Sequence, residues 1–236
     1  MYTLLLKFSA PLQSWGNESK FNTRRTWEEP SKSGVTGLLA AALGRQREDD
    51  ISDINRLRLG TRTDAPGKII KDFHVFAPTE KPNKQNTISE RYYLCDATFL
   101  VGLEWENSKD LENIIKALKS PIYTLYLGRR SCPANYDLVL GIRENDLETT
   151  LWTEPWIASS RKKEILCRKN NCLIPEMKLV IETKQGEIRD GTRNDVAISF
   201  DPNFRQYGFR GIKVLYKPEV SRTEKKIIEH DPIAEL

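Results

Sequence analysis

Long apolar runs are missing from this sequence of 236 residues: no stretch approaches the roughly 20 apolar residues that a membrane-spanning helix needs. The short apolar segment at residues 2–6 has no charged region before it and no small-residue cleavage site after it. It is therefore typical of a first strand rather than of a secretory signal. We expect a cytoplasmic protein with no membrane partner.

Cysteine and histidine are also scarce, with four and two residues. No Cys-x-x-Cys pair occurs, and both histidines, His74 and His230, are distant in sequence from every cysteine. We therefore expect neither a zinc site nor another cofactor. With 39% hydrophobic and 30% charged residues, the composition is that of a globular protein, and the chain is long enough to bury a core without disulfides.

The formal net charge of +4 is weak evidence for a polyanionic partner, so the placement of the charges matters more. Each short basic group alone can be a solvated surface, but several groups in the loops of one folded half would favour a binding site. The groups are Arg24-Arg25, residues 68–71, Lys81 with Lys84, Arg129-Arg130, residues 161–163 and Arg168-Lys169.

The motif Tyr-Leu-Gly-Arg-Arg-Ser-Cys-Pro at residues 126–133 sets two arginines between a glycine and a proline. This pattern favours a built turn that holds Arg129 and Arg130 in one orientation, as bidentate recognition of phosphate or carboxylate requires. The same residues also fit ordinary solvated charges. One arginine could instead brace the turn against Asp96 or another carboxylate.

A helix is predicted at residues 35–43 because its apolar residues recur on one helical face, with Ser33 as N-cap and Gly44 at the C-terminal end. Residues 30–34, Pro-Ser-Lys-Ser-Gly, bring hydroxyls and Lys32 to the start of this helix. Free N–H groups and the helix dipole favour an anion there. A plain serine cap is the alternative interpretation.

Periodicity predicts an α+β protein with the order strand, helix, two strands, helix, strand. This is the ferredoxin-like (RRM-like) βαββαβ order, and we assign it to residues 1–142. The expected elements are a strand at 2–8, a long hairpin from about Lys68 to Arg91, one alternating strand at 93–103, a second helix at 111–118 and a strand at 122–127 that ends at the two arginines.

Residues 143–236 are predicted to form a small β-rich C-terminal lobe, from β-prone segments at 177–182, 196–200 and 211–216. Its aromatic and basic segment at 201–210 suits single-stranded RNA or a protein interface equally well. The glycine-aromatic motif of RNA-binding sheets is absent from the sequence, so RNA would bind through loops.

Four motifs together resemble the Cas5 family of CRISPR-associated proteins, and its subtype I-E branch most closely. They are Ala-Pro-Leu-Gln-Ser-Trp-Gly at 10–16, Ser-Gly-x-x-Gly-Leu-Leu at 33–39, Tyr-Leu-Cys-Asp-Ala at 93–97 and the double-arginine motif at 126–133. The C-terminal lobe resembles the family only loosely, through residues 198–202.

The resemblance implies a non-catalytic subunit that caps one end of the Cascade complex and holds the 5′ handle of the CRISPR RNA, with a thumb-like hairpin at about 70–91. The implied partners are the Cas7 backbone subunits, the large subunit Cas8e (Cse1) and, through the complex, target DNA. Gln13 and Trp15 are expected to shape the first loop. The RNA-binding residues carried over are Arg24, Lys32, Arg91, Arg129 and Arg130, with Ser33 at the same helix start as Lys32.

A metal-independent endoribonuclease, as in the subtype I-C branch, is the rival hypothesis. It would use His74 as general base, together with Lys71 or a nearby tyrosine. A lone histidine in a strand is more often structural, however. Subtype I-E systems are associated with a separate Cas6-type nuclease. The resemblance to this subtype therefore favours the non-catalytic interpretation.

Overall fold

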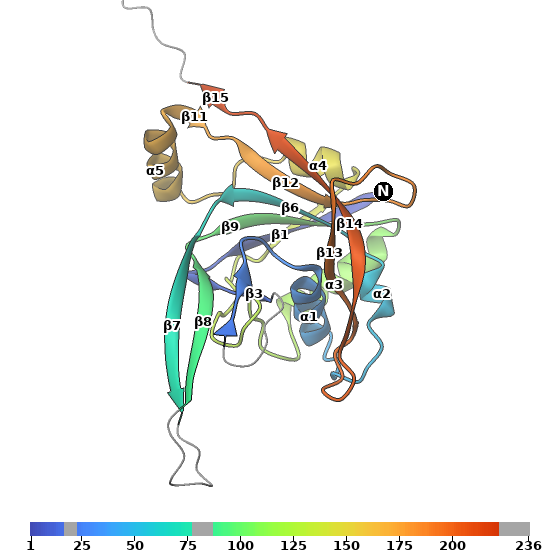
Figure 1. Ribbon diagram of the computed structural model, residues 1–236. Helices are drawn as coiled ribbons and strands as arrows, with labels where there is room; N and C mark the ends of the chain where they lie inside the picture. Colours follow the sequence, from blue (N-terminus) through green and yellow to red (C-terminus); the bar gives the residue numbers. More distant parts are fainter. Residues whose placement is uncertain (17–22, 77–86, 222–236) are drawn as a thin grey trace, which may run out of the picture.

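The computed structural model describes residues 1–16, 23–76 and 87–221, so Lys81, Lys84 and the tip of the expected hairpin lie outside the described residues. A seven-stranded antiparallel sheet in the order β10-β1-β9-β6-β12-β14-β13 forms the centre (Figure 1). Its strands are β1 (Tyr2–Ser9), β6 (Arg58–Ala65), β9 (Thr98–Trp105), β10 (Val139–Arg143), β12 (Met177–Glu182), β13 (Gly191–Ser199) and β14 (Gln206–Lys217).

Strands from both sides of residue 142 share this one sheet, because β12 pairs with β6. The three strand segments predicted in the C-terminal part are confirmed as β12 and as parts of β13 and β14. The division of the chain into two domains stays a prediction.

The predicted hairpin is confirmed: β7 (Lys68–Phe76) and β8 (Thr87–Cys95) pair along their whole length and project away from the central sheet (Figure 1). Short strands flank it. The smaller strands are β2 (Leu12–Gln13) and β4 (Thr23–Arg24), which pair with β8, β3 (Trp15–Gly16) with β5 (Thr26–Trp27), and β11 (Cys172–Ile174) with β15 (Val220–Ser221).

Helices cover both faces of the central sheet (Figure 1). They are α1 (Lys32–Ala42), α2 (Ser52–Asn55), α3 (Ser108–Lys119), α4 (Leu147–Thr153) and α5 (Ser160–Asn170). The helices predicted at 35–43 and 111–118 are confirmed as α1 and α3. Helices α4 and α5 were not predicted and lie where only β structure was expected.

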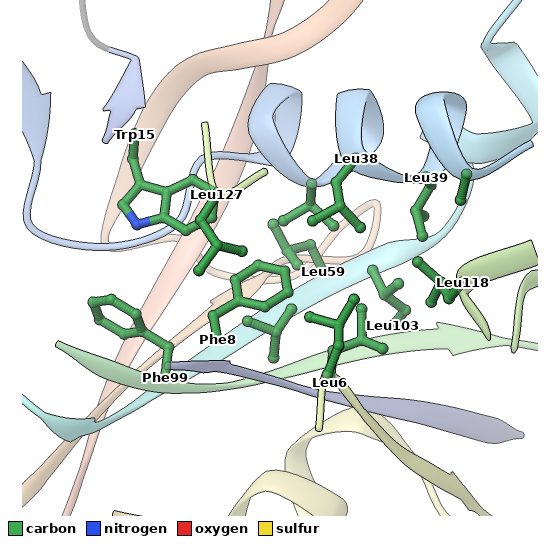
Figure 2. Packing of buried hydrophobic residues seen from close by; sticks show 14 of the residues in the cluster. Leu6, Phe8, Trp15, Leu38, Leu39, Leu59, Phe99, Leu103, Leu118 and Leu127 are labelled. Carbon is green, nitrogen blue, oxygen red and sulfur yellow. The ribbon is translucent and has the colours of Figure 1, made fainter. Parts of the chain in front are cut away.

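The core has two parts because successive side chains of a strand point to opposite faces. From β1, Leu4, Leu6 and Phe8 join the large cluster under α1 and α3, and Leu5 joins a smaller cluster under α4. Figure 2 shows Trp15 beside Phe8; their stacked rings are 5.4 Å apart. Each fully buried side chain of this size contributes about 1.5–3 kcal/mol.

The single strand predicted at 93–103 is wrong. Asp96 has φ +59°, and its N–H donates to the Pro11 carbonyl over 3.0 Å. This turn ends β8 at Cys95, and β9 begins at Thr98 as a separate, central strand. A short polar residue that tolerates the left-handed conformation therefore interrupts an otherwise regular alternation.

The strand predicted at 122–127 is also wrong. The N–H groups of Ile122 and Tyr123 donate to the carbonyls of Ala42 and Ala41, which lie in the last turn of α1. The fourth strand of the N-terminal part is instead β10, which pairs with β1.

The expected N-cap is displaced by two residues. Ser31 rather than Ser33 caps α1, and its hydroxyl accepts from the Gly34 N–H over 3.2 Å. The expected end of the helix is confirmed, because Gly44 follows the C-cap with φ +76°.

Candidate nucleic-acid interface

The double-arginine motif forms a closed turn between two buried anchors. Leu127 N–H donates to the Cys132 carbonyl over 2.7 Å, and Tyr126 forms a bridge with Pro133. The side chains of Leu127 and Cys132 are fully buried. The turn therefore holds Arg129 at the surface on a fixed base.

Gly128 is required at this position. Its φ is +89°, and a Cβ atom would overlap the carbonyl oxygen of Ser14. The Ser14 N–H also donates to the Leu127 carbonyl over 3.1 Å, which keeps the two segments together. Only glycine combines this conformation with such a close approach.

Arg129 is held by backbone carbonyls rather than by Asp96. Its Nη1 donates to the Tyr92 carbonyl over 3.1 Å, and its Nη2 donates to the Arg24 carbonyl over 2.9 Å. The guanidinium lies 5.0 Å from the centre of the Tyr93 ring. Burial lowers the pKa of Arg129, and the contact with Tyr93 opposes this shift. The side chain thus braces the turn against β4 and β8.

Two more arginines lie beside this brace. Arg24 of β4 is in register with Arg91 of the parallel neighbour β8, so both side chains start from the same face. Arg24 is also close enough to Arg129 to lower its pKa, in addition to burial. The Nε atom of Arg91 is buried and has no hydrogen-bond partner in the described part of the chain.

We call Arg24, Arg91, Arg129 and Arg130 the arginine cluster. Arg24 and Arg130 are exposed, and Arg91 and Arg129 are half-buried. Among the residues that the structure describes, none of the four forms an ion pair with a carboxylate. A group of like charges without carboxylates raises the local positive potential, which attracts polyanions.

Lys32 and Ser33 lie elsewhere. Lys32 is 4% exposed, and its ammonium donates to both carboxylate oxygens of Glu182, over 2.6 and 2.8 Å. Its backbone N–H donates to Asp195 over 2.7 Å. Burial lowers the pKa of Lys32, and the charge of Glu182 opposes this. Ser33 donates to the hydroxyl of Ser31 over 3.4 Å. Lys32 thus contacts β12 and β13, not the elements of the arginine cluster.

The candidate nuclease residues lie on the hairpin. His74 Nε2 is 2.6 Å from Asp72, and the Lys71 ammonium donates to Glu90 over 2.8 Å. Residues 71 and 74 are an odd number of positions apart in β7, so their side chains point to opposite faces. The structure therefore does not bring this base and this cation together.

Gln13 and Trp15 shape the loop after β1, as expected. Gln13 is fully buried, and its amide donates to the Ala97 carbonyl over 3.0 Å. The Trp15 indole N–H donates to the Gln13 side chain over 3.1 Å. These contacts position the segment that carries Ser14, against which Gly128 packs.

Within residues 1–16, 23–76 and 87–221, no three His, Cys, Asp or Glu side chains gather where they could hold a metal ion. Over the same ranges, no helix has both the length and the apolar character needed to cross a bilayer.

The family model "CRISPR-associated protein (Cas_Cas5)" matches residues 3–213. The chain is 35% identical over 160 residues to the CRISPR system Cascade subunit CasD of Escherichia coli (strain K12). The match covers 58% of this chain and 70% of that protein. The chain is thus a CRISPR-associated protein.

Two solved structures are similar over almost the whole chain. A chain of a CRISPR RNA-guided surveillance complex is 30% identical with a TM-score of 0.74, covering 92% of this chain and 90% of that one. A second structure, described as a Cas protein, is 34% identical with a TM-score of 0.68, covering 94% and 98%. This protein belongs to the Cas5 family, and the resemblance seen in its sequence is confirmed.

Proposed function

We propose that this chain is the subunit of an I-E-like Cascade complex that binds and caps the 5′ handle of the CRISPR RNA. Its similarity to CasD and to a chain of a surveillance complex supports membership of such an assembly. The observation that carries the RNA-binding role is the arginine cluster, whose four cations have no carboxylate partner among the described residues.

Within the cluster the arginines have different tasks. Arg129 donates from both terminal nitrogens to backbone carbonyls, which holds the turn in place. It therefore fixes the shape of the cluster and adds one positive charge to it. Arg24 and Arg130 are exposed and free to donate to phosphate oxygens. Contacts of this kind position a nucleic acid, and base contacts add specificity.

The partners follow from the same assignment: Cas7 backbone subunits, the large subunit Cas8e and, through the complex, target DNA. One face of the hairpin supports a protein contact. Ile69, Phe73 and Val75 of β7 alternate on this face, with Ile88 of β8 opposite Val75. All four side chains are about half exposed or more. Exposed apolar side chains in a row are typical of an interaction surface.

The N-terminal part is proposed to be a ferredoxin-like unit. The strands β10, β1, β9 and β6 are neighbours in this order, and all pairs are antiparallel. Helices α1 and α3 connect them on one face, although α2 and the hairpin are added. This order of strands supports the proposed relation to RNA-recognition modules.

The proposed role is non-catalytic. An RNA-cleaving site would need a base and a cation facing the same phosphodiester. His74 and Lys71 instead point to opposite faces, and each is paired with a carboxylate of the hairpin. No contact among the described residues favours the nuclease hypothesis over the RNA-binding one.

The test is a pair of double variants in the assembled complex. Arg24→Ala with Arg130→Ala removes two exposed cations of the cluster, and Arg47→Ala with Arg56→Ala removes two exposed arginines from outside it. We expect the first variant to retain less CRISPR RNA. The slope of log affinity against log salt concentration should be shallower by about 0.7 for each lost contact with the single strand. The second should behave as wild type. Equal retention by both variants would contradict the proposal.

A further inference from the structure

Helix α5 is unusual in having no buried residue. It carries five cationic residues and one acidic residue, Glu164. The cationic residues are Arg161, Lys162, Lys163, Arg168 and Lys169. The arginine cluster does not include this helix, so its charge needs a separate explanation.

The outer face of α5 is formed by Arg161, Glu164, Ile165, Arg168 and Lys169, which are all exposed and recur at helical spacing. Arg161 and Lys169 have no carboxylate partner in the described chain. Arg168 pairs only with Glu164 of its own helix, over 2.7 Å. An exposed pair of this type is weak and can be exchanged for another anion.

Many other surface cations of this protein have carboxylate partners from elsewhere in the chain. Lys7 pairs with Asp137, for example, and Arg143 pairs with Glu154. On the outer face of α5, no other element supplies a carboxylate within the described residues. The excess charge on this helix is therefore left for a partner.

The first turn of α5 points to the same conclusion. It has no acidic residue and contains Arg161, Lys162 and Lys163, although the helix dipole disfavours cations at an N-terminus. Lys162 turns inward, where its ammonium donates to Thr98 over 3.2 Å, and Lys163 lies 5.4 Å from the Trp156 ring. These contacts account for Lys162 and Lys163, so Arg161 is the cation of this turn that has no partner within the described residues.

Thr98 begins β9 directly after the hairpin, so its contact with Lys162 fixes α5 next to the base of β7 and β8 (Figure 1). With 11 residues, α5 is about 16 Å long, which matches several phosphates of one strand at about 3.4 Å per nucleotide. Ile165 is the single large apolar side chain that the helix exposes. Protein interfaces instead centre on aromatic and apolar anchors and are poor in lysine.

We propose that the outer face of α5 is a second nucleic-acid contact, which binds a sugar-phosphate backbone without reading its sequence. The phosphates are those of DNA, because the proposed function assigns the CRISPR RNA to the arginine cluster and leaves target DNA as the other polyanion of the assembly; to this extent the inference rests on the proposed function. This site is independent of the arginine cluster and goes beyond the proposed handle binding.

The test uses the assembled complex with its CRISPR RNA, and a matched pair of triple variants. Arg161→Ala, Arg168→Ala and Lys169→Ala remove the exposed cations of α5. Lys109→Ala, Lys116→Ala and Lys119→Ala remove three exposed lysines of α3, a helix of similar length. Binding of a DNA duplex of about 30 base pairs and of a single-stranded RNA of about 30 nucleotides, both of unrelated sequence, is measured by fluorescence anisotropy against salt.

We expect the α5 variant to bind the duplex about tenfold more weakly near 0.1 M salt, with a slope of log affinity against log salt lower by about 0.9 per lost contact. A loss confined to the RNA would overturn the assignment to DNA. A charge-conserving variant, Arg161→Lys, Arg168→Lys and Lys169→Arg, should retain binding even where the alanine variant folds poorly.

Unchanged binding of both probes would overturn the inference, including the case in which the α5 variant loses a protein partner instead. Equal losses from the α3 and α5 variants would also overturn it, because net charge alone would then explain the effect. Retention of the CRISPR RNA itself is recorded in parallel. It should fall in the Arg24 and Arg130 variant and not in the α5 variant, which separates this inference from the proposed function.

Discussion

The start of α1 and the turn at residues 126–133 look alike in sequence but differ in the structure. Each sets a cation within two positions of a glycine. At the start of α1, Glu182 and Asp195 from distant strands bind the ammonium and the backbone N–H of Lys32. In the turn, carbonyls hold Arg129. Whether a basic motif faces a ligand therefore depends on whether a distant strand supplies a carboxylate.

The two regions also contribute differently to the fold. Lys32 belongs to a buried set of charges in which Asp195 also pairs with Arg210, so it joins α1 to the C-terminal strands. The turn joins the loop after β1 to β4 and β8 and leaves its charge at the surface. A change in the first region should reduce stability, and a change in the second should reduce RNA binding.

The largest effect is expected from Gly128→Ala, which tests the frame of the turn. The added methyl would overlap the Ser14 carbonyl at a positive φ. We expect a loss of about 3–5 kcal/mol in the free energy of unfolding, from backbone strain and overpacking together. Chemical denaturation measures this.

Gly186→Ala is the control for that experiment, because Gly186 has φ +86° but no atom within 4 Å of an added Cβ. It should cost only the strain of about 1–2 kcal/mol. Similar losses for the two variants would mean that the contact with Ser14 does not matter.

Lys32→Met is expected to destabilise by about 3 kcal/mol, because it leaves the carboxylate of Glu182 without its cation in a largely buried site. Lys178→Met, which breaks a more exposed pair with Glu29, should cost less than about 1 kcal/mol. RNA binding per folded molecule should not change in either variant. A selective loss of RNA affinity in Lys32→Met would show that this residue belongs with the arginine cluster after all.

Arg129→Ala should affect both properties. It removes the hydrogen bonds to the Tyr92 and Arg24 carbonyls and one charge of the cluster. We expect a loss of about 1–2 kcal/mol in stability and about tenfold in RNA affinity. Arg129→Lys retains the charge but cannot donate to both carbonyls in the same way. If the lysine variant equals wild type in denaturation and in binding, the brace has no role.

Arg130→Ala should change binding alone, since Arg130 is exposed and forms no ion pair in the described chain. The stability should stay within about 0.5 kcal/mol of wild type, and the RNA affinity should fall several-fold. Filter binding at two salt concentrations gives both the affinity and its salt dependence. An affinity that stays at the wild-type value would remove Arg130 from the site.

The smallest effect is expected from His74→Ala on the hairpin. Incubation of the purified chain with repeat RNA and no divalent metal should leave the RNA intact for wild type and variant alike. A discrete cleavage product that disappears in His74→Ala would favour the nuclease hypothesis.

The sequence predicted the parts of the fold that local patterns encode. The apolar faces of α1 and α3 and the pairing of β7 with β8 have periods that a sequence displays. It failed where a tertiary contact decides the backbone. The alternation at 93–103 hides the turn at Asp96, and the segment at 122–127 takes its partners from the end of α1.

The sequence likewise predicted some parts of the candidate site and not others. The glycine and the paired arginines of the turn are visible in sequence, and Gly128 does have the conformation that only glycine adopts readily. The atoms that hold Arg129 are backbone carbonyls, which every residue has, so no residue type could reveal them. The burial of Lys32 depends on Glu182, 150 positions along the chain.

Crosslinking of the CRISPR RNA to this chain inside its native assembly tests the central claim most directly. The account predicts that the handle crosslinks to residues around Arg24, Arg91 and Arg130, and that none maps to Lys32. Crosslinks of the handle that fall entirely on neighbouring subunits would contradict it.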